Sequence, residues 1–294
     1  MALTRRAFFP ALAAALAPSG RARAEAAPLP VVASFSIIGD FVKQVGGDAV
    51  ALSTIVGPNG DAHVYEPTPQ DGRKLAGARV VFINGLGFEG WIERLIKASG
   101  TRARIVTLSD GVASRKDENG LDPHAWQNVE NAIKYVEEIG AALAAADPGR
   151  GSTYGAGAEA YRRRLSLLDA EIARTFEKIP RERRRIVSTH DAFGYFAARY
   201  GLEFIAPQGV STESEASARD VAKIIDAVKA NKVAAVFLEN IADPRLTQRI
   251  AAETGVKIGG TLYSDALSEP GGPASTYIDM MRHNVGELAK ALGA

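Results

Sequence analysis

The sequence predicts an α/β protein of two lobes, each with a mainly parallel sheet flanked by helices, joined by one long rigid helix. Short apolar runs alternate with stretches of helical spacing in two separate parts of the chain, a pattern typical of parallel sheets with crossover helices. Between these parts lies a long stretch of uninterrupted helical spacing. With 294 residues, the chain is also longer than one hydrophobic core usually organises.

The first series of elements predicts an N-terminal lobe at residues 25–151. Helical spacing of apolar residues directly follows the first apolar run, and further short apolar runs follow along the chain. We expect strands at residues 31–35, 50–56, 79–83 and 103–108, with helices at 36–45, 89–99 and 129–146.

Residues 152–179 are expected to form the linking helix. From Ser152 to Lys178 there is no proline, and large apolar residues recur at helical spacing. At 1.5 Å per residue such a helix is about 40 Å long, more than one small lobe needs. We therefore interpret it as the spacer between lobes.

After Pro180 the alternation restarts and predicts a C-terminal lobe at residues 180–294. Parallel sheets of this kind bind ligands in a crevice at the carboxyl ends of their strands. The expected strands are residues 186–189, 204–206, 234–238 and a last one from 257, with helices at 191–200, 218–231, 244–253 and 277–292.

The first 24 residues are typical of an export signal. Arg5 and Arg6 precede an apolar stretch at 7–18, and Ala22-Arg23-Ala24 offers a cleavage site after Ala24. The stretch is too short for a membrane-spanning helix. The paired arginines also resemble a twin-arginine signal, although ordinary signals contain such pairs too. These features predict a periplasmic protein.

Composition excludes several classes of partner and site. Without cysteine, the chain has no disulfides, no thiolate metal ligands and no lipid-bearing Cys, so we expect a freely diffusing protein that is not a lipoprotein. We also expect a monomer. Its 35 Lys and Arg balance 34 Asp and Glu, so neither nucleic acid nor stable membrane insertion is expected.

Three of the four histidines lie in loops or turns near strand ends, where binding residues are usually placed. His63, His124 and His190 occupy equivalent positions of the two lobes and can converge on one crevice. Each alone would be interpreted as a surface or capping residue; together they predict a site for a borderline-soft metal ion. His283 lies on the amphipathic C-terminal helix and is expected to be a helix-surface residue.

A carboxylate usually completes a shell of imidazoles. Asp265 follows the last strand of the second lobe and so faces the same crevice as His190. Two acidic neighbours of the histidines, Asp122 and Asp191, could orient an imidazole, but they are also good helix N-caps; Glu66 is a third such neighbour. The carboxylates considered as the fourth ligand are Glu66, Glu213, Glu239 and Asp265.

Five motifs in order resemble the zinc/manganese solute-binding receptors of ABC transporters, over nearly the whole mature chain. They are His63 in H-x-Y-E-P, His124 in D-P-H-x-W, His190 in T-H-D-A-F-G-Y-F, the run Gly-Val-Ser-Thr-Glu-Ser-Glu at 209–215, and Asp265-Ala-Leu. The resemblance implies two α/β lobes bridged by a long helix. It also implies metal ligands at His63, His124, His190 and Asp265, and delivery of the ion to an ABC permease of the inner membrane.

The chain departs from the family pattern at two places. Residues 109–121 lack the histidine-rich loop that zinc receptors often carry, and His190 stands where manganese receptors tend to have Glu. A third imidazole favours Zn²⁺ over Mn²⁺, with Mn²⁺ and Fe²⁺ left open.

Two other classes of protein are alternatives to a receptor that binds the free metal ion. A zinc-dependent hydrolase usually keeps an open coordination position, and the sequence has neither H-E-x-x-H nor G-x-S-x-G. A receptor for a chelated metal, such as a siderophore or haem, would need a wide aromatic or Arg-lined pocket.

Overall fold

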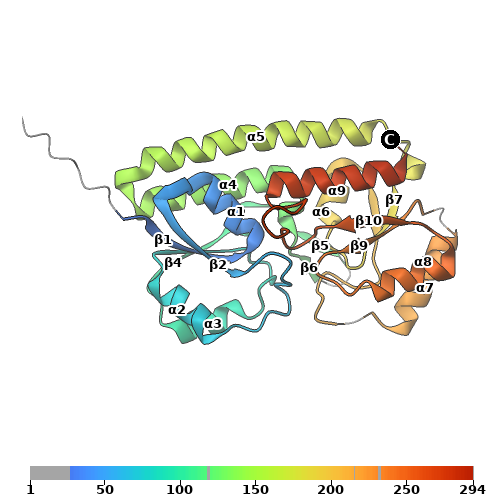
Figure 1. Cartoon of the computed structure of the whole chain (residues 1–294), viewed down its shortest axis with the longest axis horizontal. Helices are drawn as coiled ribbons and strands as arrows, with labels where there is room; N and C mark the ends of the chain where they lie inside the picture. The colour runs from blue at the N-terminus through green and yellow to red at the C-terminus, as the bar shows by residue number, and fades with distance from the viewer. Residues whose placement is uncertain (1–26, 118–119, 215, 231–232, 294) are drawn as a thin grey trace, which may run out of the picture.

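The two predicted lobes lie side by side in the computed structural model (Figure 1). It describes residues 27–117, 120–214, 216–230 and 233–293; the predicted signal peptide, residues 1–24, lies outside them. One sheet has the strand order β2-β1-β3-β4 and the other β10-β9-β7-β8, and all pairs within both sheets are parallel. The predicted fold class is confirmed.

The first lobe contains a helix, α2 (Pro69–Gly77), and a small hairpin that were not among the expected elements. Two three-residue strands, β5 (Arg115–Asp117) and β6 (Gly120–Asp122), pair antiparallel within the charged segment after β4. Their polar and charged residues give no strand signal in the sequence. Each of the two strands pairs only with the other. The other elements are β1 (Leu29–Phe35), α1 (Ser36–Gly46), β2 (Val50–Val56), β3 (Val80–Ile83), α3 (Ile92–Ser99), β4 (Arg104–Thr107) and α4 (Val129–Ala146).

The long helix α5 (Gly151–Glu177) runs along both lobes (Figure 1). It buries a single stripe at three- and four-residue spacing and packs this stripe on α1 and α4 of the first lobe and on α6 and α9 beyond. The helix ends differ from the expected 152–179 by one or two residues, and the lobe limits at 151 and 180 stay a prediction. The buried stripe is Tyr154, Ala158, Tyr161, Leu165, Leu168, Ile172 and Phe176.

The second lobe repeats the alternation of strands and helices. Helix α6 begins at Gly194 rather than at the expected residue 191, because the chain first turns after His190, where the Ala192 N–H donates to the His190 carbonyl. Its elements are β7 (Arg185–Val187), α6 (Gly194–Tyr200), β8 (Glu203–Ile205), α7 (Ala218–Ala230), β9 (Val236–Glu239), α8 (Arg245–Thr254), β10 (Ile258–Leu262) and α9 (Tyr277–Leu292).

The two lobes share one buried apolar cluster, which extends from β1 to α9. Hydrogen bonds join them on the same side: the Leu267 N–H donates to Ser36 Oγ at 3.0 Å, and the Tyr277 N–H donates to Asp40 Oδ2 at 2.9 Å. Helix α9 lies beside α5 there (Figure 1). The lobes are thus packed together along the α5 and α9 side. Among the described residues, no helix has both the length and the apolar character to cross a membrane.

A glycine on α5 makes the close packing of this helix testable. A Cβ at Gly157 would lie 2.2 Å from the Val45 carbonyl oxygen of α1, whereas one at Gly155 would meet no atom within 4 Å. We expect Gly157→Ala to lower the free energy of unfolding by about 1–3 kcal/mol through overpacking. Gly155→Ala should be neutral or stabilise by up to about 1 kcal/mol through helix propensity. Urea denaturation measures both, and equal stabilities would contradict the close approach of the helices.

Candidate metal centre

The three loop histidines have their backbones fixed in the same way. The His63 N–H donates to Asp61 Oδ1 at 2.9 Å, and the His124 N–H donates to Asp122 Oδ1 at 3.0 Å. The His190 N–H donates to Glu239 Oε1, also at 2.9 Å. In the first two cases the carboxylate lies two residues earlier, the Asx turn that Asp favours in loops. Each ligand loop is therefore held by an acidic side chain.

These loops bring four side chains to one point between the lobes. His63, His124, His190 and Asp265 each offer a ligand atom, and these atoms all lie within 4.8 Å of one another. His63 Nε2 lies 3.4 Å from His124 Nε2, and the Asp265 oxygens lie 3.3, 3.6 and 3.2 Å from the Nε2 atoms of the three histidines in chain order. Ligands at 2.0–2.1 Å around a tetrahedral ion are separated by about 3.3 Å. The spacing suits a single ion.

The four side chains are shielded from solvent. His63 is 5% exposed, and the other three are fully buried. Neither carboxylate oxygen of Asp265 accepts a well-directed hydrogen bond within the described structure. A buried carboxylate without such partners is costly, and a cation among these atoms removes that cost. The donor set of three imidazoles and one carboxylate is one that Zn²⁺ and related ions accept.

The carboxylates at the centre favour protonation of the His124 and His190 imidazoles while no ion is bound. Burial lowers the pKa of His124, but the carboxylates of Asp265 and Asp122 outweigh it and raise this pKa to about 9. For His190, burial likewise opposes the charges of Glu239 and Asp265, which raise its pKa well above the usual value. Burial favours the neutral form of Asp265, yet the two imidazoliums lower its pKa well below the ordinary range. A cation that enters must displace these protons.

Two carboxylates orient the imidazoles from behind. Asp122 Oδ1 lies 2.9 Å from His124 Nδ1, and Glu239 Oε2 lies 2.6 Å from His190 Nδ1. Both contacts leave Nε2 of the same ring facing the centre. Such partners fix the tautomer of a ligating histidine and raise its basicity. Arg115 Nε in turn donates to Asp122 Oδ2 at 3.4 Å.

The remaining acidic and histidine candidates lie outside the cluster. Glu239, considered from the sequence as a fourth ligand, instead orients His190; its position at the carboxyl end of β9, beside β7, was the signal for this role. Glu66 and Glu213 are exposed. His283 is half-buried rather than on an open helix surface, because its Nε2 lies 2.9 Å from the Thr261 carbonyl oxygen.

Two α/β lobes joined by a long helix, with a buried cluster of three histidines and one aspartate between them, are the architecture of a metal-binding receptor of the solute-binding type. A family described as "ZnuA: Zinc-uptake complex component A periplasmic" matches residues 31–291. The chain belongs to this family, whose members are periplasmic metal-binding receptors of ABC transporters. The predicted resemblance is confirmed.

Relatives and solved structures carry the names of several metals. The chain is 35% identical to the manganese-binding lipoprotein MntA of Halalkalibacterium halodurans, over 90% of this chain and 88% of MntA. It is 32% identical to the iron-binding protein YfeA of Yersinia pestis, over 90% and 86%. The structure of the periplasmic zinc-binding protein TroA from Treponema pallidum superposes with a TM-score of 0.87 at 32% identity, covering 92% of this chain and all of TroA.

One expectation is corrected by these names. The protein was expected not to be a lipoprotein, but MntA, SsaB of Streptococcus sanguinis and MtsA of Streptococcus pyogenes are all named lipoproteins. The absence of cysteine excludes only a lipid attached to a cysteine of this sequence. Composition therefore does not support the wider conclusion that was drawn from it. Export across the cytoplasmic membrane is supported; a freely diffusing form is not.

The raised imidazole pKa values predict a steep dependence of metal binding on pH. Coordination requires neutral imidazoles, so below a pKa of about 9 for His124 the ion competes with protons. We expect the apparent affinity for Zn²⁺ to rise as the pH increases up to about 9, the pKa of His124, with more than one proton released per ion. Competition with a chromophoric chelator at each pH measures this. A flat profile between roughly pH 5 and 7 would be incompatible with three histidine ligands.

Proposed function

We propose that this protein captures Zn²⁺ in the periplasm with His63, His124, His190 and Asp265 and delivers it to an ABC permease of the inner membrane. The convergence of four buried ligand atoms within 4.8 Å, from loops of both lobes, carries the proposal. Binding between lobes allows the ion to be enclosed for transport and released when the lobes part. The relative MtsA is named an iron ABC transporter substrate-binding lipoprotein, and this name supports an ABC permease as the partner.

The choice of Zn²⁺ rests on the donor set. Three imidazoles and a single carboxylate favour a borderline-soft ion, whereas Mn²⁺ prefers a larger share of oxygen ligands. Mn²⁺ and Fe²⁺ are the competing cargoes, in keeping with relatives named for manganese and iron. Elemental analysis of protein purified without added metal distinguishes the three ions.

We further propose that the protein is a monomer and not an enzyme. Four protein ligands fill a tetrahedral shell, while a catalytic zinc keeps a position open for water. The relatives SsaB and MtsA are named substrate-binding lipoproteins, which supports a binding role. Zn²⁺-dependent hydrolysis of esters or amides by the wild-type protein, lost with a carboxylate near the site, would overturn this part.

Replacing Asp265 tests the ligand set. Asp265 supplies the only negative charge among the four ligands, so Asp265→Ala should fold but bind Zn²⁺ at least about 10–100-fold more weakly. Glu213→Ala removes an exposed carboxylate and is the matched control, with unchanged affinity expected. Isothermal titration with a competing chelator compares them. Full affinity in Asp265→Ala, or a loss confined to Glu213→Ala, would show that the fourth ligand is assigned wrongly.

Bound Zn²⁺ should also stabilise the fold. An ion that binds only the native state adds about 2.7 kcal/mol at a free concentration of 100 times Kd. We therefore expect Zn²⁺-loaded protein to melt several degrees above chelator-treated protein, with most of this difference lost in Asp265→Ala. Differential scanning calorimetry measures the shift, and superimposable curves at saturating metal would contradict a site between the lobes.

A further inference from the structure

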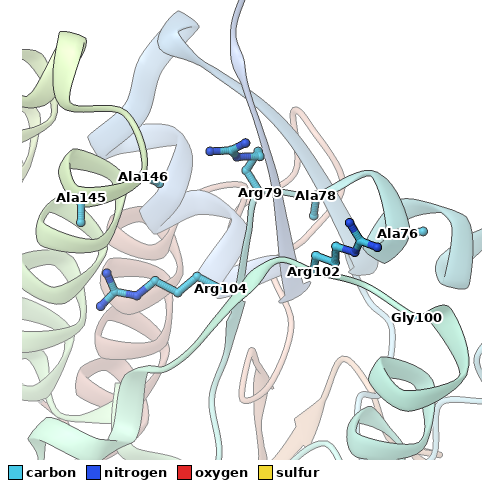
Figure 2. A pocket seen from close by; sticks show the side chains of 8 residues that line it. All are labelled: Ala76, Ala78, Arg79, Gly100, Arg102, Arg104, Ala145 and Ala146. Carbon is cyan, nitrogen blue, oxygen red and sulfur yellow. The ribbon is translucent and has the colours of Figure 1, made fainter.

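The first lobe has a second concave site, far along its strands from the metal ligands. A cavity of about 550 Å³ opens at the amino ends of β3 and β4, and three arginines, Arg79, Arg102 and Arg104, line it (Figure 2). The rest of the lining is small: alanines at the ends of α2 and α4, and the glycine after α3. The metal ligands of this lobe follow the opposite, carboxyl ends of its strands.

Backbone pairing fixes two of the three arginines, Arg79 and Arg104, at this edge. The Arg79 N–H donates to the Pro30 carbonyl at 2.9 Å, and the Arg104 N–H donates to the Arg79 carbonyl at 3.0 Å. Because β3 and β4 are parallel and begin side by side, their first residues reach the same edge of the sheet. These two cations are therefore gathered by the fold itself.

The positive charges of these arginines are not neutralised. No carboxylate lines the cavity, and among the described residues no ion pair or side-chain hydrogen bond involves any of the three guanidinium groups. In a chain with a formal net charge of +1, three unpaired cations around one hollow form a local excess of positive charge. Guanidinium groups with free donors bind oxyanions through paired hydrogen bonds.

Helix C-termini at the same edge offer a structural explanation for the arginines, because their partial negative charges attract cations. Comparing the two amounts of charge tests this explanation. Helices α2, α3 and α4 all end beside the cavity, and each C-terminus carries about half a negative charge. Three such ends offset about 1.5 of the three positive charges. Within the described part of the chain, none of the three cavity guanidinium groups donates to a carbonyl of these helices, so their donors remain available for a ligand.

The arrangement of the side chains indicates the size of the ligand. Figure 2 shows Arg104 extending toward Ala145 of α4 and Arg102 toward Ala76 of α2, with Arg79 on a third side. Side chains that fan out around a hollow of this volume suit a ligand with more than one anionic group. We propose that this cavity binds a ligand with two or more phosphate groups, either a free polyphosphate or the headgroup of a diphosphate lipid.

The test uses inorganic pyrophosphate with the metal-free full-length mature protein. The variant Arg79→Gln/Arg102→Gln/Arg104→Gln should bind pyrophosphate at least about tenfold more weakly than wild type in calorimetric titration. The control Arg174→Gln/Arg181→Gln/Arg219→Gln removes three exposed arginines from elsewhere, changes the net charge equally, and should bind like wild type. Should the first triple variant aggregate, each single substitution is expected to weaken binding severalfold.

A second arm identifies the source of the phosphates. Vesicles of phosphatidylcholine with cardiolipin are compared with phosphatidylcholine alone by co-sedimentation. Cardiolipin-dependent binding that the arginine triple variant loses assigns a lipid headgroup; pyrophosphate binding without it assigns a free ligand. The proposal fails if wild type binds neither probe, or if both triple variants bind equally. Zn²⁺ affinity should be the same in all three proteins, so the outcome is independent of the metal site.

Discussion

The constraint on which this structure depends is the burial of a carboxylate among three imidazoles. Taking charged groups out of water costs several kcal/mol per ion unless they are paired. Asp265 and the histidines are within reach of one another only because loops from both sheets end at one point. The lobes, the linking helix and the carboxylates behind the histidines all serve to hold that arrangement.

Acidic side chains hold the loops of the three clustered histidines. Asp61, Asp122 and Glu239 each accept a backbone N–H from a ligand histidine, and the last two also contact its ring. The loops are thereby defined by the same acidic groups that select the tautomers. A substitution at one of these carboxylates would disturb backbone and ring together, which makes them less tolerant than ordinary loop residues.

Much of the fold could be predicted from the sequence, because periodicity is local. The apolar runs of β1 and β3 and the apolar stripe of α5 can be recognised from the sequence alone. The positions of His63, His124 and His190 near predicted strand ends can be recognised in the same way. The β5–β6 hairpin was missed, because its charged residues carry no strand signal. The position of Glu239 at the end of β9 marked it as a site residue, but its choice between ligand and orienting group depends on its contact with His190. The half-burial of His283 likewise depends on a distant neighbour, Thr261, which spacing does not encode.

The indole of Trp126 has a consequence for how the crevice can open. Trp126 Nε1 and Gln127 Nε2 both donate to the carbonyl of Ser264, at 3.0 and 2.7 Å, and both bonds are buried. One oxygen thus ties the turn that carries His124 to the residue before Asp265, across the lobe boundary. Separating the His124 turn from Asp265 would break both of these buried hydrogen bonds. We therefore expect His124 and Asp265 to move together when the crevice opens.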